Sequence, residues 1–329
     1  MHVLVTGGAG FIGSHACKAL AAGGFLPVAY DSFVTGHAEA VRFGPLVRGD
    51  VRDTDTLVQA MRHHRIGAVM HFAASAYVGE SMIDPAKYYE NNVGGMQSLL
   101  SAMRQTSVQN IVFSSSCATY GIPDQLPITE ASPQNPINPY GRSKLIGEQM
   151  LRDYGAAYGL NHISLRYFNA AGADPAGTLG EWHEPETHVL PLALMAAAGK
   201  RPALEVYGTD YDTPDGTCIR DYIHVSDLAR AHVLALHYLR AGGEPVALNL
   251  GSGKGHSVRD LADAIYRVTG RPVPMIDMPR RAGDPPVLTA DPSAAAARLN
   301  FRTELSDLDT IVETAAPWFL SEIRHAHTR

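Results

Sequence analysis

Tyr140 and Lys144 lie four residues apart in the segment that begins at Asn138. Residues at this spacing share one face of an α-helix. An ammonium beside a phenol stabilises the phenolate and so lowers a phenol pKa that starts near ~10. Such a pair would be a general base able to take a proton from an alcohol near neutral pH. A surface pair on an amphipathic helix fits the spacing equally well, so other residues must distinguish the two interpretations.

Three serines, Ser114–Ser116, follow an apolar stretch at 110–113 that predicts a β-strand. Parallel sheets bind ligands at the carboxyl ends of their strands, so we expect these hydroxyls to face a ligand. One of them could donate a hydrogen bond to a substrate hydroxyl and pass its proton to Tyr140. The alternative is a strand end whose serines cap the next turn. Cys117 fits a packing residue better than a nucleophile, because no histidine lies at a suggestive spacing from it.

Gly7, Gly10 and Gly13 lie between an apolar strand and a segment with helical spacing. The spacing is a weak signal alone, but in this position glycines allow a tight turn and close approach of the backbone to a pyrophosphate. The helix N-terminus would then bind the anion. Asp31 ends the second predicted strand and could accept hydrogen bonds from an adenosine ribose, which favours NAD over NADP. A turn-forming role for Asp31 is the alternative.

The elements that must position these residues alternate regularly through the first half of the chain. Short β-branched runs are separated by longer segments with helical spacing, which is typical of a parallel sheet covered by helices on both faces. The helix with Tyr140 has a clear start signal, with Asn138 as N-cap and Pro139 as first helical residue. The predicted strands are His2–Thr6, Pro27–Asp31, Ala68–Phe72, Asn110–Ser115 and His162–Tyr167.

After about residue 169 the pattern changes, because Gly and Pro become denser and the connections lengthen. We therefore predict an α/β fold with a doubly wound parallel Rossmann sheet in residues 1–168. A second, smaller α/β domain is predicted for residues 169–329. The segment 221–239 and the strand-like Val246–Leu250 are expected to pack back on the first domain.

Composition excludes several classes of protein. The 329 residues carry a net charge of −6 without a basic block, so nucleic acid is not an expected partner. No run is long and apolar enough to span a membrane, and a first strand at His2 leaves no room for a signal peptide. Three widely spaced cysteines favour the cytoplasm, since they form neither a disulfide framework nor a zinc pattern. His63–His64, His183 and His188 show no ligand spacing with nearby acids, so no metal is expected.

Taken together, the glycine spacing, Ser116 and the Tyr140/Lys144 pair resemble the extended short-chain dehydrogenases/reductases, and more narrowly the UDP-glucose 4-epimerases. The resemblance implies NAD-dependent, reversible epimerisation at C4 of a UDP-hexose through a transient 4-keto sugar. It also implies a homodimer formed through two helices of each subunit. The segments that carry the resemblance run nearly from end to end: His71–Ala74, Val78–Ser81, Tyr88–Val93, Arg166–Asn169, Asp215–Thr217, Arg220–Val225 and Arg281–Asp284.

The resemblance further implies roles for individual residues. Tyr140 would be the base that takes the proton of the sugar 4-hydroxyl, and Ser116 would assist it by hydrogen bonding. Lys144 would hold the nicotinamide ribose and lower the pKa of Tyr140. With Tyr140 and Lys144, the NAD site would comprise Gly7, Gly10, Phe11, Ile12, Gly13, Asp31, Asp50, Val51, Phe72, Ala73, Ala74, Asn91 and Phe168. With Ser116 and Tyr140, the UDP-sugar site would comprise Asn169, His188, Val189, Val206, Tyr207, Arg220, Arg281, Asp284 and Leu288.

Three positions depart from the family's pattern. Ala76–Tyr77 lack a lysine that some members carry near the cofactor, and His188–Val189 replace an asparagine–leucine pair. Leu288 stands where some members have tyrosine and others cysteine, at a position that limits room for an N-acetyl group. We therefore expect that UDP-N-acetylhexosamines are accepted alongside UDP-hexoses.

Other enzymes of the same branch remain alternatives. His71–Ser81 and residues 204–220 also resemble UDP-arabinose/UDP-xylose 4-epimerases, and a UDP-glucuronate epimerase would share the chemistry. A 4,6-dehydratase is disfavoured because Cys117–Ala118 stands where its acid–base pair is usual. Asp31 disfavours a simple reductase that uses NADPH. A non-catalytic nucleotide sensor is disfavoured by the intact serine, tyrosine and lysine.

Overall fold

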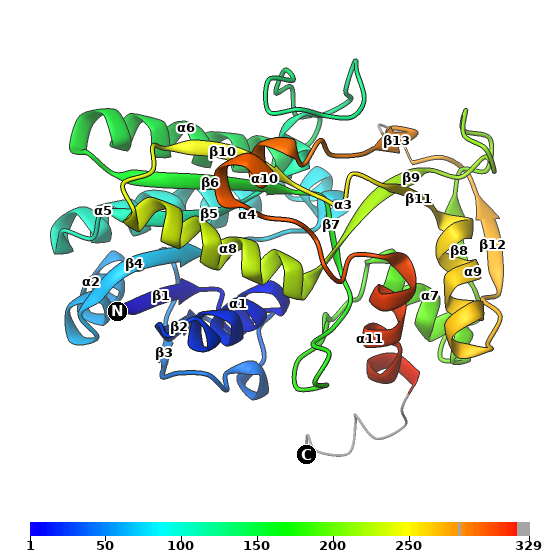
Figure 1. Ribbon diagram of the computed structural model, residues 1–329, viewed down its shortest axis with the longest axis horizontal. Coiled ribbons are helices and arrows are strands. Elements are labelled where there is room, and N and C mark those ends of the chain that lie inside the picture. Colours follow the sequence, from blue (N-terminus) through cyan, green and yellow to red (C-terminus); the bar gives the residue numbers. More distant parts are fainter. Residues whose placement is uncertain (282–283, 321–329) are drawn as a thin grey trace.

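The computed structural model describes residues 1–281 and 284–320. A seven-stranded parallel sheet occupies the left part of Figure 1, with strand order β10-β6-β5-β4-β1-β2-β3. The order reverses between β1 and β4, and such a switch point is where open α/β sheets bind ligands. The strands are β1 (His2–Thr6), β2 (Leu26–Asp31), β3 (Leu46–Arg48), β4 (Ile66–His71), β5 (Asn110–Ser116), β6 (Asn161–Tyr167) and β10 (Val246–Leu250).

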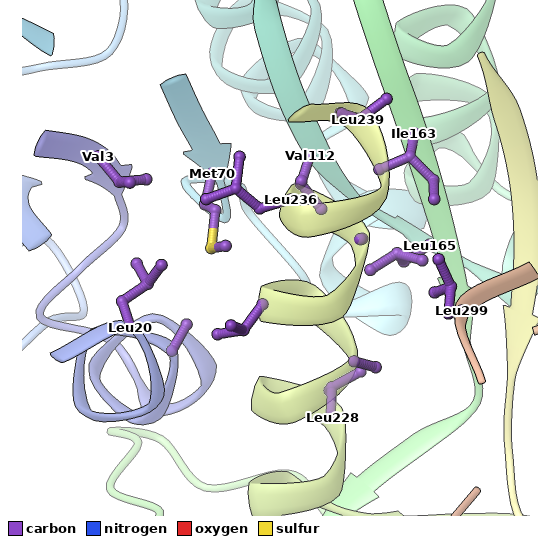
Figure 2. Packing of buried hydrophobic residues seen from close by; sticks show 14 of the residues in the cluster. Val3, Leu20, Met70, Val112, Ile163, Leu165, Leu228, Leu236, Leu239 and Leu299 are labelled. Atoms are coloured by element: carbon purple, nitrogen blue, oxygen red, sulfur yellow. The ribbon is translucent and has the colours of Figure 1, made fainter. Parts of the chain in front are cut away.

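Two hydrophobic cores lie on the two faces of this sheet. Successive strand residues point to opposite faces, so Val3 and Val5 enter one core and Leu4 the other. In the first core, Leu20 of one helix and Leu236 of another lie around Met70 of β4 (Figure 2). That face is covered by α1 (Phe11–Ala22), α8 (Val225–Arg240) and α10 (Ser293–Leu299), and the opposite face by α2 (Thr54–His63), α5 (Gly95–Thr106) and α6 (Pro139–Tyr158).

The second half of the chain builds a smaller α/β unit at the right of Figure 1. Its four-stranded sheet contains β7 (Asn169–Ala171), β9 (Ile219–His224), β11 (Gly255–Ser257) and β13 (Val287–Leu288), and β8 (Leu204–Tyr207) pairs with β12 (Met275–Met278). A third hydrophobic core packs α7 (Val189–Ala197), α9 (Val258–Thr269) and α11 (Leu308–Leu320) against these strands.

Helix α6 has capping residues at both of its ends. The Asn138 side chain accepts a hydrogen bond of 2.8 Å from the Gly141 amide, and Pro139 occupies the first turn. Gly159 ends the helix in the left-handed conformation with φ of 70°. These signals hold Tyr140 in the first turn, at the carboxyl end of the sheet. The cleft also receives residues from α3 (Val78–Ile83), α4 (Pro85–Tyr88), the π-helix η2 (Tyr89–Gly94), and a 3₁₀ turn, η3 (Cys117–Thr119).

The structure agrees with the predicted elements to within two residues at each strand end, and it confirms the fold class. Strand β10 pairs in parallel with β6, and α8 packs against α1. The first core therefore includes residues from beyond position 220. The division at 168/169 remains our proposal.

No helix in the described ranges is long and apolar enough to cross a membrane. Cys17, Cys117 and Cys218 are free thiols. Burial raises the pKa of Cys117 to about 12, which suits a packing residue rather than a nucleophile.

Candidate active site

A cleft of about 1470 Å³ lies between the carboxyl end of the seven-stranded sheet and the smaller unit. Every residue that the sequence predicted for the two sites lines it. From the first half these are Gly7, Gly10, Phe11, Ile12, Gly13, Asp31, Asp50, Val51, Phe72, Ala73, Ala74, Asn91, Ser116, Tyr140, Lys144 and Phe168, and from the second half Asn169, His188, Val189, Val206, Tyr207, Arg220, Arg281, Asp284 and Leu288. Ala282 and Gly283, between Arg281 and Asp284, lie outside the described residues.

The glycine turn after β1 forms a cradle that side chains would fill. Gly7 has φ of +73°, and a Cβ there would lie 2.7 Å from the Ala73 amide nitrogen. A Cβ on Gly13 would lie 2.1 Å from the Gly7 carbonyl oxygen. Backbone can therefore approach a bound group closely, and the first turn of α1 points unpaired amides toward it. The cradle fits the pyrophosphate of a dinucleotide.

Asp31 holds the loop after β2 and still faces the cleft. Its two carboxylate oxygens accept hydrogen bonds from the Ala9 amide at 3.0 Å and the Phe33 amide at 2.9 Å. The turn-forming role is therefore present, and each carboxylate oxygen keeps a further lone pair for a ribose hydroxyl. The two interpretations of Asp31 are compatible.

The Asp50 carboxylate is paired within its own turn. It accepts hydrogen bonds from the Arg52 amide at 2.8 Å and from the Arg52 guanidinium at 2.7 Å. The Arg52 side chain is the main reason that the pKa of Asp50 lies below its ordinary value. The Tyr30 hydroxyl donates to the Asp50 carbonyl at 2.8 Å, which fixes the backbone next to buried Val51.

Tyr140 and Lys144 share the face of α6 that packs on the sheet, as their spacing predicted. Tyr140 is only 9% exposed, and its ring meets Tyr88 edge to face at 6.4 Å. The Lys144 ammonium donates to the Ser114 carbonyl at 2.8 Å and lies 5.9 Å from the centre of the Tyr140 ring. Both groups are therefore held by the end of β5.

The predicted lowering of the Tyr140 pKa is not found in this arrangement. Burial, reinforced by the Tyr167 phenol, raises the pKa of Tyr140 above its ordinary value, while a hydrogen bond with Ser116 acts in the opposite direction. Burial also lowers the pKa of Lys144 to about 7. The expectation was wrong because it counted the attraction of the ammonium and left out the cost of desolvating both groups.

The three serines at the end of β5 have three different tasks. The Ser114 hydroxyl is 2.5 Å from the Tyr167 hydroxyl, and Ser115 donates to the Glu148 carboxylate at 2.5 Å. Ser116 accepts from the Ala118 amide at 3.1 Å, which is the expected capping role, and its hydroxyl also meets the Tyr140 phenol. Of the three serines, Ser116 thus has the contact that proton transfer requires.

The far end of the cleft carries cationic and aromatic groups. The Arg281 guanidinium lies 4.4 Å from the centre of the Tyr207 ring and 3.4 Å from the Asp284 carboxylate. Arg220 donates to the Ile219 carbonyl at 2.9 Å. Asn169 donates to the carbonyl of residue 221 at 3.0 Å. This end combines the charge to bind a diphosphate with a flat surface for a base.

Asp221 follows Arg220 directly, but its carboxylate accepts hydrogen bonds from backbone amides and forms no salt bridge with Arg220 in the described residues. It accepts hydrogen bonds from the Ser252 amide at 2.8 Å, the Gly253 amide at 3.0 Å and the Ala290 amide at 3.1 Å. The pKa of Asp221 is raised overall, because burial outweighs the opposite effect of these hydrogen bonds. The carboxylate thereby ties β9 to the loops that border the cleft.

Residues 3–251 match the NAD dependent epimerase/dehydratase family. The chain belongs to this family. It is 53% identical to the UDP-glucose 4-epimerase of Rhizobium meliloti over 96% of each chain. It also superposes on the UDP-glucose 4-epimerase of Brucella ovis in complex with NAD, with TM-score 0.95, 63% identity and coverage of 97% and 98%. The UDP-glucose-4-epimerase of Stenotrophomonas maltophila, with bound NAD and formylated UDP-arabinopyranose, gives TM-score 0.94 at 42% identity over 97% of each chain.

Membership of the NAD dependent epimerase/dehydratase family confirms three predictions. The enzyme is of the UDP-glucose 4-epimerase type, its cofactor is NAD, and its fold is that of the solved relatives. The family match ends at residue 251, one residue after β10. The roles of the individual site residues remain proposals.

One group of polar residues at the cleft wall was not predicted from the sequence. His183 and His188 do have acidic neighbours, because Glu181 and Glu186 lie within 3.5 Å of them. The prediction that these histidines lack ligand spacing was therefore wrong. The signal was present as alternating acids and histidines over eight residues, but the fold of an irregular loop decides whether they meet.

Proposed function

We propose that this enzyme interconverts UDP-glucose and UDP-galactose by reversible epimerisation at C4. The supporting observation is that Ser116, Tyr140 and Lys144 lie in one cleft between the glycine cradle and the arginine-bearing end. A dinucleotide and a UDP-sugar laid along that cleft would meet at the tyrosine. NAD, when bound, supplies the group that accepts the hydride from C4 and later returns it.

In this proposal the first half of the cleft holds NAD. The cradle formed by Gly7, Gly10 and Gly13 would take the pyrophosphate, and Asp31 the adenosine ribose. Phe11, Ile12, Asp50, Val51, Phe72, Ala73, Ala74, Asn91 and Phe168 would line the remaining cofactor surface. The reaction is an isomerisation, so the same NAD molecule is needed to oxidise the sugar and then to reduce it. This favours a deep cofactor site from which NAD is released slowly.

Tyr140 would take the proton of the 4-hydroxyl while Ser116 hydrogen-bonds the same oxygen. The buried phenol is expensive to ionise here, since its pKa is raised by burial. Lys144, about one helical turn away, would offset this cost when protonated, because an ammonium stabilises a nearby phenolate. The proton would return to the sugar oxygen from Tyr140 after the 4-keto sugar has turned over in the cleft.

The far end of the cleft would anchor the UDP part. Arg220 and Arg281 suit a diphosphate because a guanidinium donates two parallel hydrogen bonds. Tyr207 and Val206 would flank the uracil, and Asn169, His188, Val189 and Asp284 would border the diphosphate and sugar. Contacts concentrated on UDP leave the hexose free to present either face.

Proton NMR of the purified protein with UDP-galactose and no added nucleotide tests this function. We expect UDP-glucose to appear until the two sugars reach a stable mixture. Failure to convert UDP-galactose even after NAD is added would exclude the hexose epimerase and favour a pentose substrate. UDP-xylose and UDP-arabinose in the same assay would then measure that alternative.

A wider substrate range is a second candidate. Leu288 lies in β13 at the cleft and packs with Phe168 and Ile128. Because leucine is smaller than tyrosine, this wall leaves room for an N-acetyl group, and UDP-N-acetylhexosamines would be accepted. A Leu288→Tyr variant should then lose activity on UDP-N-acetylglucosamine more than on UDP-glucose. An unchanged ratio of the two rates would exclude this role for Leu288.

We further propose that the protein works as a homodimer in the cytoplasm. The support is the family resemblance, which implies a dimer through two helices per subunit, and the three free thiols. Light scattering coupled to gel filtration should give a mass near twice 35.3 kDa. A single-chain mass at assay concentration would exclude the dimer.

A further inference from the structure

The wall of the cleft contains a compact group of metal-ligating side chains that the proposed reaction does not use as a unit. Glu181, His183, Glu186 and His188 lie in the loop directly before α7, outside any helix or strand. Each offers one ligand atom, and these four atoms all lie within 4.8 Å of one another. The Glu181 and Glu186 side chains are 3% and 8% exposed, whereas His183 is 18% and His188 43% exposed, so the carboxylates are buried and the histidines face the cleft.

The nitrogen-to-oxygen distances within the group are close to those of a tetrahedral metal centre. The nitrogen-to-oxygen separations are 2.9 Å for His188 Nδ1 to Glu181 and to Glu186, and 3.3 and 3.5 Å for His183 Nδ1 to the same two residues. Four ligands at ~2.0–2.1 Å from a zinc ion are separated from one another by about 3.3 Å. These four separations lie within about 0.4 Å of that value, and all four ligand atoms lie within 4.8 Å of one another.

One nitrogen of the group has ion pairs but no hydrogen bond. His183 Nδ1 is buried and has no hydrogen-bond partner, although two carboxylates lie within 3.5 Å of it. It is one of four ligand atoms that lie within 4.8 Å of one another, so a point between them is within reach of this nitrogen. A cation at that point would satisfy this nitrogen and both carboxylates at once.

We propose that Glu181, His183, Glu186 and His188 bind one divalent cation of the zinc type and that the ion fixes this loop against the cleft. Two imidazole nitrogens with two carboxylate oxygens form a mixed donor set that suits Zn²⁺ better than Mg²⁺, which takes oxygen ligands. Four protein ligands close the coordination sphere, so the site is structural.

The loop that the ion would fix touches both halves of the cleft. Trp182 stacks on His37 with ring centres 3.7 Å apart, and His183 meets Phe11 at the start of α1 at 6.3 Å. His188 is the N-cap of α7 and lies 6.3 Å from the Tyr77 ring. A cation here would therefore hold the cofactor helix, the loop and α7 in one arrangement.

Metal titration of the full-length chain tests the site independently of turnover. The protein is dialysed against a chelator and then titrated with Zn²⁺, and with Co²⁺ as a spectroscopic probe. We expect one ion per chain, an intense visible Co²⁺ spectrum typical of tetrahedral coordination, and a higher Tm with Zn²⁺ but not with equal Mg²⁺. Absence of a stoichiometric ion or of a tetrahedral spectrum would overturn the proposal, whatever the epimerase assay shows.

Matched variants locate the ion. His183→Gln and Glu186→Gln should each weaken Zn²⁺ binding at least tenfold and remove the rise in Tm. His63→Gln changes an exposed histidine in α2 and should leave both unchanged. Equal loss in all three, or unchanged binding in the two site variants, would contradict the assignment. Circular dichroism of each variant distinguishes lost binding from lost folding.

Discussion

At the scale of single residues, the cleft is built around a phenol that is costly to ionise. Tyr140 is buried beside Tyr88 and Tyr167, and burial raises its pKa while lowering that of Lys144 to about 7. Neither group would be useful alone, but a phenolate and an ammonium stabilise each other when they ionise as a pair. The chemistry therefore depends on the pair and not on the tyrosine by itself.

Tyr140→Phe removes the proposed base and leaves the ring that packs against Tyr88. We expect turnover of UDP-galactose to fall by about 10²- to 10⁴-fold, the usual contribution of general acid–base catalysis. Bound NAD, measured by its absorbance after denaturation of the protein, should remain. Full activity in the variant would refute the role of Tyr140, and loss of NAD would show a structural role instead.

Gly13→Ala tests the cradle after β1. A Cβ at this position would lie 2.1 Å from the Gly7 carbonyl oxygen, so the turn and α1 must separate. We expect loss of co-purified NAD and a lower Tm, since overpacking of this kind costs about 1–3 kcal/mol. Gly94→Ala is the control, because its nearest neighbour would be 4.0 Å away. Equal effects in the two variants would contradict a specific cradle.

At the scale of elements, a buried ion pair joins α6 to β6. The Glu148 carboxylate of α6 accepts two bonds from the Arg166 guanidinium of β6, at 2.9 and 2.6 Å, and both side chains are at most 4% exposed. Ser115 and Gln134 donate to the same carboxylate. These contacts fix the position of α6, the helix that carries Tyr140, relative to β6.

Arg166→Met should destabilise the fold by about 3–5 kcal/mol, because it leaves a buried carboxylate without its partner. The double variant Arg166→Met/Glu148→Leu should be more stable than the single variant, since no unpaired charge is left. Urea unfolding followed by circular dichroism measures both. A double variant less stable than the single one would contradict this explanation.

A second pair joins α1 to the segment after β7 and predicts a pH dependence. Burial raises the pKa of Asp174, but hydrogen bonds from Lys18 at 2.5 Å and from Thr178 outweigh it and lower the pKa from 3.8 to about 2. A carboxyl with a lowered pKa in the folded state contributes stability above pH ~4 that is lost as the pH falls toward 2. Lys18→Met should therefore cost about 1 kcal/mol at pH 7 and almost nothing near pH 2. A difference that does not depend on pH would refute the pairing.

Local signals explain which elements could be predicted from the sequence. Asn138, Pro139 and Gly159 mark both ends of α6, and alternating apolar residues mark the strands, because both depend on near neighbours. The smaller sheet gives weaker signals, since β13 has two residues and β7 three. Alternating acids and histidines marked the cluster of Glu181 and its neighbours, but its distances could not be predicted, because an irregular loop determines them. The pKa of Tyr140 depends on burial, which spacing alone does not report.

At the scale of the whole molecule, the first core depends on the second half of the chain. Leu228 and Leu236 of α8 and Leu299 of α10 are buried in the same cluster as Leu20 (Figure 2). Leu248 of β10 belongs to this cluster too. We expect a fragment of residues 1–168 to lack a cooperative unfolding transition, because removal of these side chains exposes a large apolar surface. Thermal unfolding of the purified fragment measures this. A cooperative transition near that of the full chain would show that the first 168 residues are an independent domain.

The late position of β10 matters while the protein is being made. Synthesis at ~5–20 residues per second leaves roughly 4–17 s between the end of β6 and the end of β10. During that interval β6 is an uncovered sheet edge, and Ile163 and Leu165 lack the α8 side chains that bury them in the finished protein. The edge of β6 and these apolar side chains are therefore exposed during synthesis and covered in the completed molecule.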